Sequence, residues 1–180
     1  MKKALLVIDL QNDYFEGGAL PLCGVESALE NANKLIDYAH SHDIEVYVIQ
    51  HISTKEGATF FLPNTKGVEL HKKLKSTNST YITKHFPNSF RETTLEENLK
   101  AQNIKELIIC GAMSHICVDS TVRAGFDLGY CVTVVEDACA TRDLSFNGEV
   151  ISAKEVHGSF MSALGAVFAS VVSTKELIDD

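Results

Sequence analysis

Three residues that could together carry out nucleophilic chemistry lie far apart in the chain: Asp9, Lys84 and Cys117. A cysteine sulfur attacks carbonyl carbons, a carboxylate can accept the thiol proton, and a lysine ammonium stabilises negative charge on sulfur. Such a set could carry out nucleophilic attack on a carbonyl group, provided that folding brings the three side chains to one place. The elements that precede each residue decide whether this happens.

The sequence predicts a regular alternation of strands and helices. The apolar run 4–8 is too short for a helix and is typical of a strand buried on both faces of a parallel sheet. From 25 to about 42, apolar residues recur every three or four positions, which predicts a helix. The further predicted strands cover 44–49, 80–83, 106–110, 131–135 and 166–172, and the further predicted helices cover about 94–103, from about 115, and about 150–164.

This alternation predicts an α/β fold with a mostly parallel six-stranded sheet and right-handed crossovers. With 180 residues and no internal repeat, the chain is expected to form one domain over residues 1–180. Ligands of such sheets bind outside the carboxyl ends of the strands. Asp9, His51 and Lys84 follow the first three predicted strands, and Cys117 comes shortly after the fourth.

The segment around Cys117 is expected to begin a helix with Ser114 as its N-cap. A cysteine in the first turn of a helix, with Lys84 nearby, should have a lowered pKa and react as a thiolate. Asp9 would then act as general base, and the backbone amides of Met113 and Cys117 would bind the developing oxyanion. The alternatives are a small buried Cys117, an Asp9 that caps a turn and a solvated Lys84.

Residues 7–13, 83–90 and 111–121 resemble three signature segments of the isochorismatase-like cysteine hydrolases, in the order of that family. The resemblance spans nearly the whole chain. It implies a three-layer α/β/α fold, which we expect to have strand order 3-2-1-4-5-6, and a catalytic triad of Asp9, Lys84 and Cys117. It also implies a cis peptide between Ala112 and Met113 and self-association into dimers or tetramers.

The resemblance also bears on the substrate. Family members that cleave isochorismate lack the nucleophilic cysteine, so the presence of Cys117 implies cleavage of a C–N bond in a small amide. Nicotinamidases of this superfamily carry an Asp-x-His metal motif near the second strand, but the segment 49–53 contains no aspartate. We therefore expect no metal and no cofactor. A nicotinamide- or isochorismate-type hydrolase remains an alternative.

Four residues are candidates for substrate binding: Phe15, His51, Phe86 and His115. Phe15 and Phe86 follow predicted strands and could help to exclude water from a thioester. His51 ends the second strand, and His115 lies two residues before Cys117, where it could line the pocket. Core packing or local hydrogen bonds would explain each of them equally well.

Charge and composition exclude other classes of protein. Sixteen Lys and Arg against 24 Asp and Glu give a net charge of −8, which disfavours nucleic acid as a partner. No apolar stretch approaches the roughly 20 residues that span a bilayer, and the N-terminal run 4–8 is shorter than a secretory core, so no membrane partner is expected. Five cysteines without a C-x-x-C pair fit a reducing compartment, and a cytoplasmic protein is expected.

Two alternatives of another class use the same residues. One is a redox-sensing or ligand-binding protein with a low-pKa Cys117 and no enzymatic activity. The other is a silent scaffold with the fold of the family. Both predict a similar sequence, and they differ from a hydrolase in how Cys117 reacts.

Overall fold

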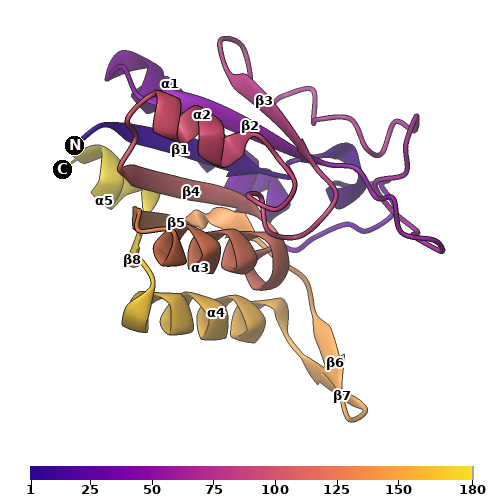
Figure 1. Cartoon of the computed structure of the whole chain (residues 1–180). Coiled ribbons are helices and arrows are strands. Elements are labelled where there is room, and N and C mark those ends of the chain that lie inside the picture. The colour runs from indigo at the N-terminus through magenta and orange to yellow at the C-terminus, as the bar shows by residue number, and fades with distance from the viewer. Residues whose placement is uncertain (180) are drawn as a thin grey trace.

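The computed structural model describes residues 1–179 and is built around a six-stranded parallel sheet with helices on both faces (Figure 1). The strands of this sheet are β1 (Lys3–Ile8), β2 (Glu45–His51), β3 (Thr80–Lys84), β4 (Glu106–Ala112), β5 (Cys131–Ala140) and β8 (Ser170–Val172). The helices are α1 (Val25–Ser41), α2 (Leu95–Ala101), α3 (Asp119–Asp127), α4 (Ala153–Val167) and α5 (Thr174–Asp179). A separate hairpin is formed by β6 (Leu144–Phe146) and β7 (Glu149–Ile151).

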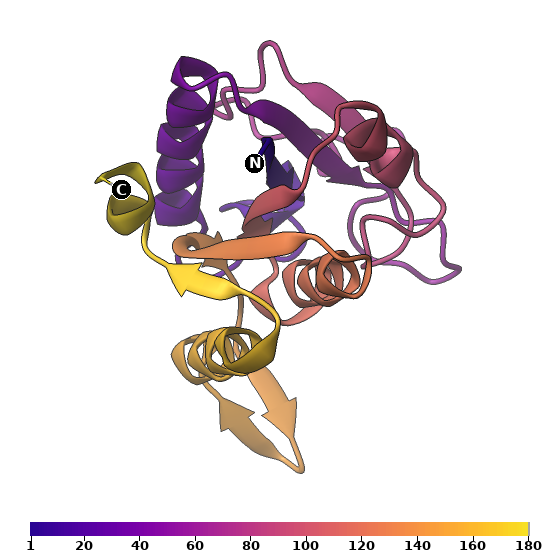
Figure 2. The same ribbon diagram turned by 60° about the vertical axis from the view of Figure 1, so that its left-hand side comes forward.

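The strand order is β3-β2-β1-β4-β5-β8, and every neighbouring pair is parallel. The predicted order 3-2-1-4-5-6 is confirmed, with β8 as the sixth strand of the sheet. Helices α1 and α5 lie on one face of the sheet, and α2, α3 and α4 lie on the other (Figure 2). This is the expected three-layer α/β/α arrangement. No helix within residues 1–179 has the length and apolarity needed to cross a bilayer.

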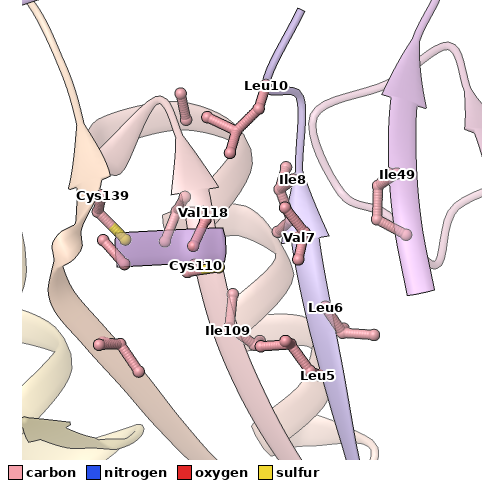
Figure 3. Packing of buried hydrophobic residues seen from close by; sticks show 14 of the residues in the cluster. Leu5, Leu6, Val7, Ile8, Leu10, Ile49, Ile109, Cys110, Val118 and Cys139 are labelled. Atoms are coloured by element: carbon pink, nitrogen blue, oxygen red, sulfur yellow. The ribbon is translucent and has the colours of Figure 1, made fainter. Parts of the chain in front are cut away.

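Strand β1 lies at the centre of the core because both of its faces are covered. Its residues from Ala4 to Ile8 are at most 1% exposed, which explains the unbroken apolar run in the sequence. Figure 3 shows β1 packed beside β4, with Val7 opposite Cys110 in the register of the two strands. This central pair forms a rigid base for the groups at the carboxyl ends of the strands.

The region after β5 differs from the prediction. The predicted helix 150–164 is shifted, because Ser152 caps α4 with a reciprocal Glu155 capping box and the helix continues to Val167. Residues 144–151 form the β6–β7 hairpin, whose turn residues Asn147 and Gly148 both have positive φ. An Asn-Gly pair is a strong hairpin signal that the sequence interpretation overlooked. The strand predicted over 166–172 begins only at Ser170, and α5 was not predicted.

Candidate active site

Four adjacent strands bring the site together. Asp9 directly follows β1, His51 is the last residue of β2, and Lys84 is the last residue of β3. Cys117 lies in the turn that follows β4. Since β3, β2, β1 and β4 are neighbours in the sheet, their carboxyl ends meet at one edge, next to the long β2–β3 connection (Figure 1). Asp9 has a φ of 52°, so the chain bends sharply as it leaves β1.

The ammonium group of Lys84 joins these residues. Its Nζ lies 2.8 Å from Asp9 Oδ2, 3.0 Å from His51 Nδ1 and 3.2 Å from Cys117 Sγ. A lysine ammonium has three N–H donors, so this arrangement uses all of them. Lys84 and Asp9 are both fully buried. Burial lowers the pKa of Lys84, but the nearby Asp9 and Cys117 outweigh it, and the net pKa is raised.

The Cys117 thiol is protonated at rest. Burial and the adjacent Asp9 carboxylate raise its pKa, and Lys84 opposes this only in part. The expected low pKa of Cys117 is therefore wrong, because Cys117 is 5% exposed and faces a carboxylate as well as a cation. The second carboxylate oxygen, Asp9 Oδ1, is buried and has no hydrogen-bond partner within residues 1–179. It is a free acceptor for the thiol proton.

The turn that carries Cys117 differs from the predicted helix start. Ser114–Val118 form a single π-helical turn that leads into α3, and the peptide bond between Ala112 and Met113 is cis. Ser114 is not the N-cap. Its buried hydroxyl lies 3.3 Å from the Ala140 carbonyl oxygen and 2.8 Å from His157 Nδ1, so it links the turn to β5 and α4.

Gln11 fixes the backbone of His51. Its side-chain amide accepts a hydrogen bond from His51 N and donates one to His51 O, each at 2.8 Å. The same amide nitrogen donates to Val68 O at 2.7 Å. The sequence interpretation noted Gln11 as one of the polar residues after the first strand but assigned it no role. A buried glutamine beside a strand end is a polar group that must be satisfied, and this was the available signal.

A cavity of about 710 Å³ opens beside His51. It is lined by residues 53–60 of the β2–β3 connection and by His85, Phe86 and Pro87 after β3. The Phe86 ring is covered by the Arg91 guanidinium, whose central carbon is 3.6 Å from the ring centroid. Phe60 and Phe86 contribute aromatic side chains to the lining, and His51 contributes an imidazole ring.

Asp13 anchors the loop that lines this cavity. Its carboxylate accepts hydrogen bonds from Phe61 N at 2.6 Å and from Ala19 N at 3.1 Å. Gly67 packs directly against this carboxylate, and a Cβ atom at that position would collide with it. Asp13 therefore fixes the segment after β1 and residues 53–68 of the β2–β3 connection, which we call the cavity loop. The sequence interpretation missed this role.

The remaining candidates for substrate binding lie in different places. His51 and Phe86 line the cavity, as expected of substrate-binding residues. Phe15 instead stacks on the His71 ring, with centroids 3.9 Å apart, and His115 Nδ1 lies 2.6 Å from Thr141 Oγ1. Neither Phe15 nor His115 lines this cavity, because local packing and a side-chain hydrogen bond engage them elsewhere.

Asp9, His51 and Cys117 could also be considered as metal ligands. One ligand atom of each lies within 4.8 Å of the others. The Lys84 ammonium, however, contacts all three side chains, so these acceptors already surround a cation. A divalent ion among them would lie against this buried positive charge, which electrostatic repulsion strongly disfavours.

Comparisons with known proteins identify the family of the chain. The family model of the isochorismatase domain matches residues 3–176. The chain belongs to the isochorismatase family. It is 45% identical to the uncharacterized isochorismatase family protein YddQ of Bacillus subtilis (strain 168), and the match covers 99% of both chains.

Solved structures and other relatives extend the match. An isochorismatase-family structure from Oleispira antarctica has a TM-score of 0.94 and 44% identity, covering 99% of this chain and 97% of that chain. The nicotinamidase of Escherichia coli (strain K12) is 28% identical and covers 97% of each chain. The protein is thus an isochorismatase-family hydrolase in sequence and in fold.

Proposed function

We propose that this protein is a cysteine amidohydrolase that cleaves the C–N bond of a small amide through a thioester on Cys117. The observation that carries this proposal is the contact of the fully buried Lys84 Nζ with both Asp9 Oδ2 and Cys117 Sγ. A base, a cation and a sulfur nucleophile in mutual contact are the groups that acyl transfer requires. The similarity to a nicotinamidase supports an amide substrate.

The first half of the reaction starts from the neutral thiol. As Cys117 Sγ attacks the carbonyl carbon, the thiol proton passes to Asp9, whose Oδ1 is free to accept it. The carbonyl electrons move to oxygen, where the backbone amides of Met113 and Cys117 act as the oxyanion hole. Asp9 then gives the proton to the leaving nitrogen, the C–N bond breaks, and ammonia or an amine departs.

The second half regenerates the enzyme. Asp9, ionised again, takes a proton from a water molecule that attacks the thioester carbonyl. Collapse of this intermediate breaks the C–S bond, and the proton returns to sulfur as the acid product leaves. Throughout both halves Lys84 keeps its positive charge, so it stabilises Asp9 as a carboxylate at rest and the sulfur when it carries negative charge.

The raised pKa of Cys117 also distinguishes between the alternatives. Redox-sensing cysteines need an accessible thiolate, whereas Cys117 is buried and its pKa is raised. A thiol that loses its proton to Asp9 only during attack suits a hydrolase better than a sensor.

The test is direct trapping of the thioester. The protein is mixed with a panel of small amides, ureas and lactams, quenched in acid within milliseconds to seconds, and measured by intact mass. We expect an acyl adduct that a peptide map places on Cys117. If substrates are turned over while Cys117→Ala is as active as the parent, the proposal is wrong.

A further inference from the structure

His51 connects the buried triad to the cavity. Its Nδ1 is 3.0 Å from Lys84 Nζ, and the same residue lines the cavity. Cys117 does not line the cavity itself, but one ring nitrogen of His51 lies within 4.8 Å of Cys117 Sγ, so a molecule in the cavity meets His51 close to the sulfur. The proposed mechanism assigns His51 no step, although hydrogen bonds hold both its backbone and its ring in place.

The contact with Lys84 fixes the form of the imidazole ring. An ammonium can only donate hydrogen bonds, so His51 Nδ1 must accept, and a neutral ring then carries its proton on Nε2. Burial and the positive charge of Lys84 lower the pKa of His51 to about 4. At neutral pH the ring is therefore uncharged, with Nε2 as an N–H donor.

This donor has no hydrogen-bond partner in the part of the chain that the structure describes. Nε2 makes no hydrogen bond within residues 1–179. It is also absent from the buried polar atoms that lack a partner, so Nε2 is accessible from outside the protein. Because His51 lines the cavity, the Nε2–H group is open to a molecule bound there. Donation from Lys84 to Nδ1 also polarises the ring, which strengthens Nε2–H as a donor.

The donor is held rigidly. Gln11 binds both backbone polar groups of His51, and Lys84 holds the side chain. The Phe61 ring packs against the imidazole, with centroids 5.9 Å apart. A fixed donor binds its acceptor without losing conformational freedom, and fixed polar groups are what give a pocket its selectivity.

We infer that the Nε2–H of His51 selects the substrate by donating a hydrogen bond to a second acceptor atom, distinct from the scissile carbonyl oxygen. This inference rests on the proposed function. The preferred substrates are small amides whose acyl part carries a carbonyl, a carboxylate or a ring nitrogen close to the scissile carbon. Amides that place only hydrocarbon there leave the Nε2–H group unpaired and bind more weakly.

The tautomer can be tested without any substrate. Two-dimensional ¹H–¹⁵N correlation spectra of the imidazole rings, assigned with His51→Gln, are recorded at pH 7. We expect a neutral His51 ring with its proton on Nε2. A proton on Nδ1, or a doubly protonated ring, would overturn the inference.

Selection is tested by binding to the Cys117→Ala variant, so that the result does not depend on hydrolysis. Calorimetry compares nicotinamide with benzamide and acetoacetamide with butanamide, two pairs in which one acceptor is replaced by a CH or CH₂ group. We expect at least one acceptor compound to bind about tenfold more tightly than its partner, the value of one good hydrogen bond. If neither pair shows a preference, the inference is wrong.

Two further variants show whether a lost binding preference comes from the missing His51 donor or from a failure to fold. In the Cys117→Ala background, His51→Leu should remove the preference, whereas His51→Gln should retain part of it, because its amide can accept from Lys84 and still donate to the cavity. If His51→Leu does not fold, the His51→Gln result and the ring spectra decide. A preference that survives intact in His51→Leu would show that another group makes it.

Discussion

The triad is held by strand ends, whereas the cavity beside it is lined mainly by a loop. Asp9 follows the central strand β1 and Lys84 ends the edge strand β3, and neither side chain is accessible to solvent. The cavity loop has no strand of its own and is fixed by side chains such as Asp13. Under the proposed function, the reacting groups therefore depend on the sheet, whereas the shape of the cavity depends on a few hydrogen bonds in the loop.

The largest effect is expected from the nucleophile itself. Cys117→Ala should lower kcat by about 10³-fold or more, since no other group can form the thioester. Steady-state assays on the best amide of the panel measure this, and urea denaturation should show little change in folding. Cys23→Ala, which alters an exposed cysteine, is the matched control and should keep full activity.

The next effect concerns the buried ion pair. Lys84→Met should lower the free energy of unfolding by about 3–5 kcal/mol, because it leaves the Asp9 carboxylate buried and unpaired. Lys75→Met breaks an exposed pair with Asp37 and should cost no more than about 1 kcal/mol. Urea denaturation of both variants makes the comparison. If both variants lost the same free energy of unfolding, burial would not explain the contribution of the Lys84–Asp9 pair to stability.

The anchor of the cavity loop should affect binding more than chemistry. Asp13→Ala removes the acceptor of Phe61 N and Ala19 N, and we expect KM to rise about five- to tenfold while kcat changes less than twofold. Gly67→Ala should act in the same direction, because its Cβ would displace the Asp13 carboxylate. Lys66→Gln, which alters an exposed side chain of the same loop outside the cavity lining, is the control. A fall in kcat with unchanged KM would contradict this division of roles.

The smallest effect is the pH dependence of His51. Its pKa is about 4 in the folded protein and about 6.5 when unfolded, so the unfolded chain binds more protons between these values. The free energy of unfolding should therefore fall as pH drops from 6.5 to 4, by about 1–2 kcal/mol after allowing for solvent screening of this half-buried ring. Urea denaturation at several pH values measures the slope. His51→Gln should flatten it, and His40→Gln on the surface of α1 should not.

The fold could be predicted from the sequence because local patterns determine it. The apolar run before Asp9 and the helical spacing after Val25 reflect burial that each element needs by itself. The β6–β7 hairpin was missed although its Asn147-Gly148 turn is a clear local signal. The shift of α4 follows from Ser152, a good N-cap that was not weighed against the apolar pattern.

The site was only partly predictable. Asp9, Lys84 and Cys117 could be found because the ends of parallel strands converge. The pKa of Cys117, however, depends on its burial and on the position of the Asp9 carboxylate, and residue types alone predict neither. The roles of Gln11 and Asp13 arise from hydrogen bonds to backbone groups about 40 or more residues away in the chain. Such contacts leave no periodic trace in a single sequence.

The pairing of β1 with β4 has a consequence for synthesis of the protein. Ile8 pairs with Gly111, so the central strand gains its second neighbour only after β4 has left the ribosome. Contacts between such distant segments form late and slowly. A nascent chain that already exposes Asp9, His51 and Lys84 therefore has no complete site, because the contact of Lys84 with Cys117 forms only in a nearly finished domain.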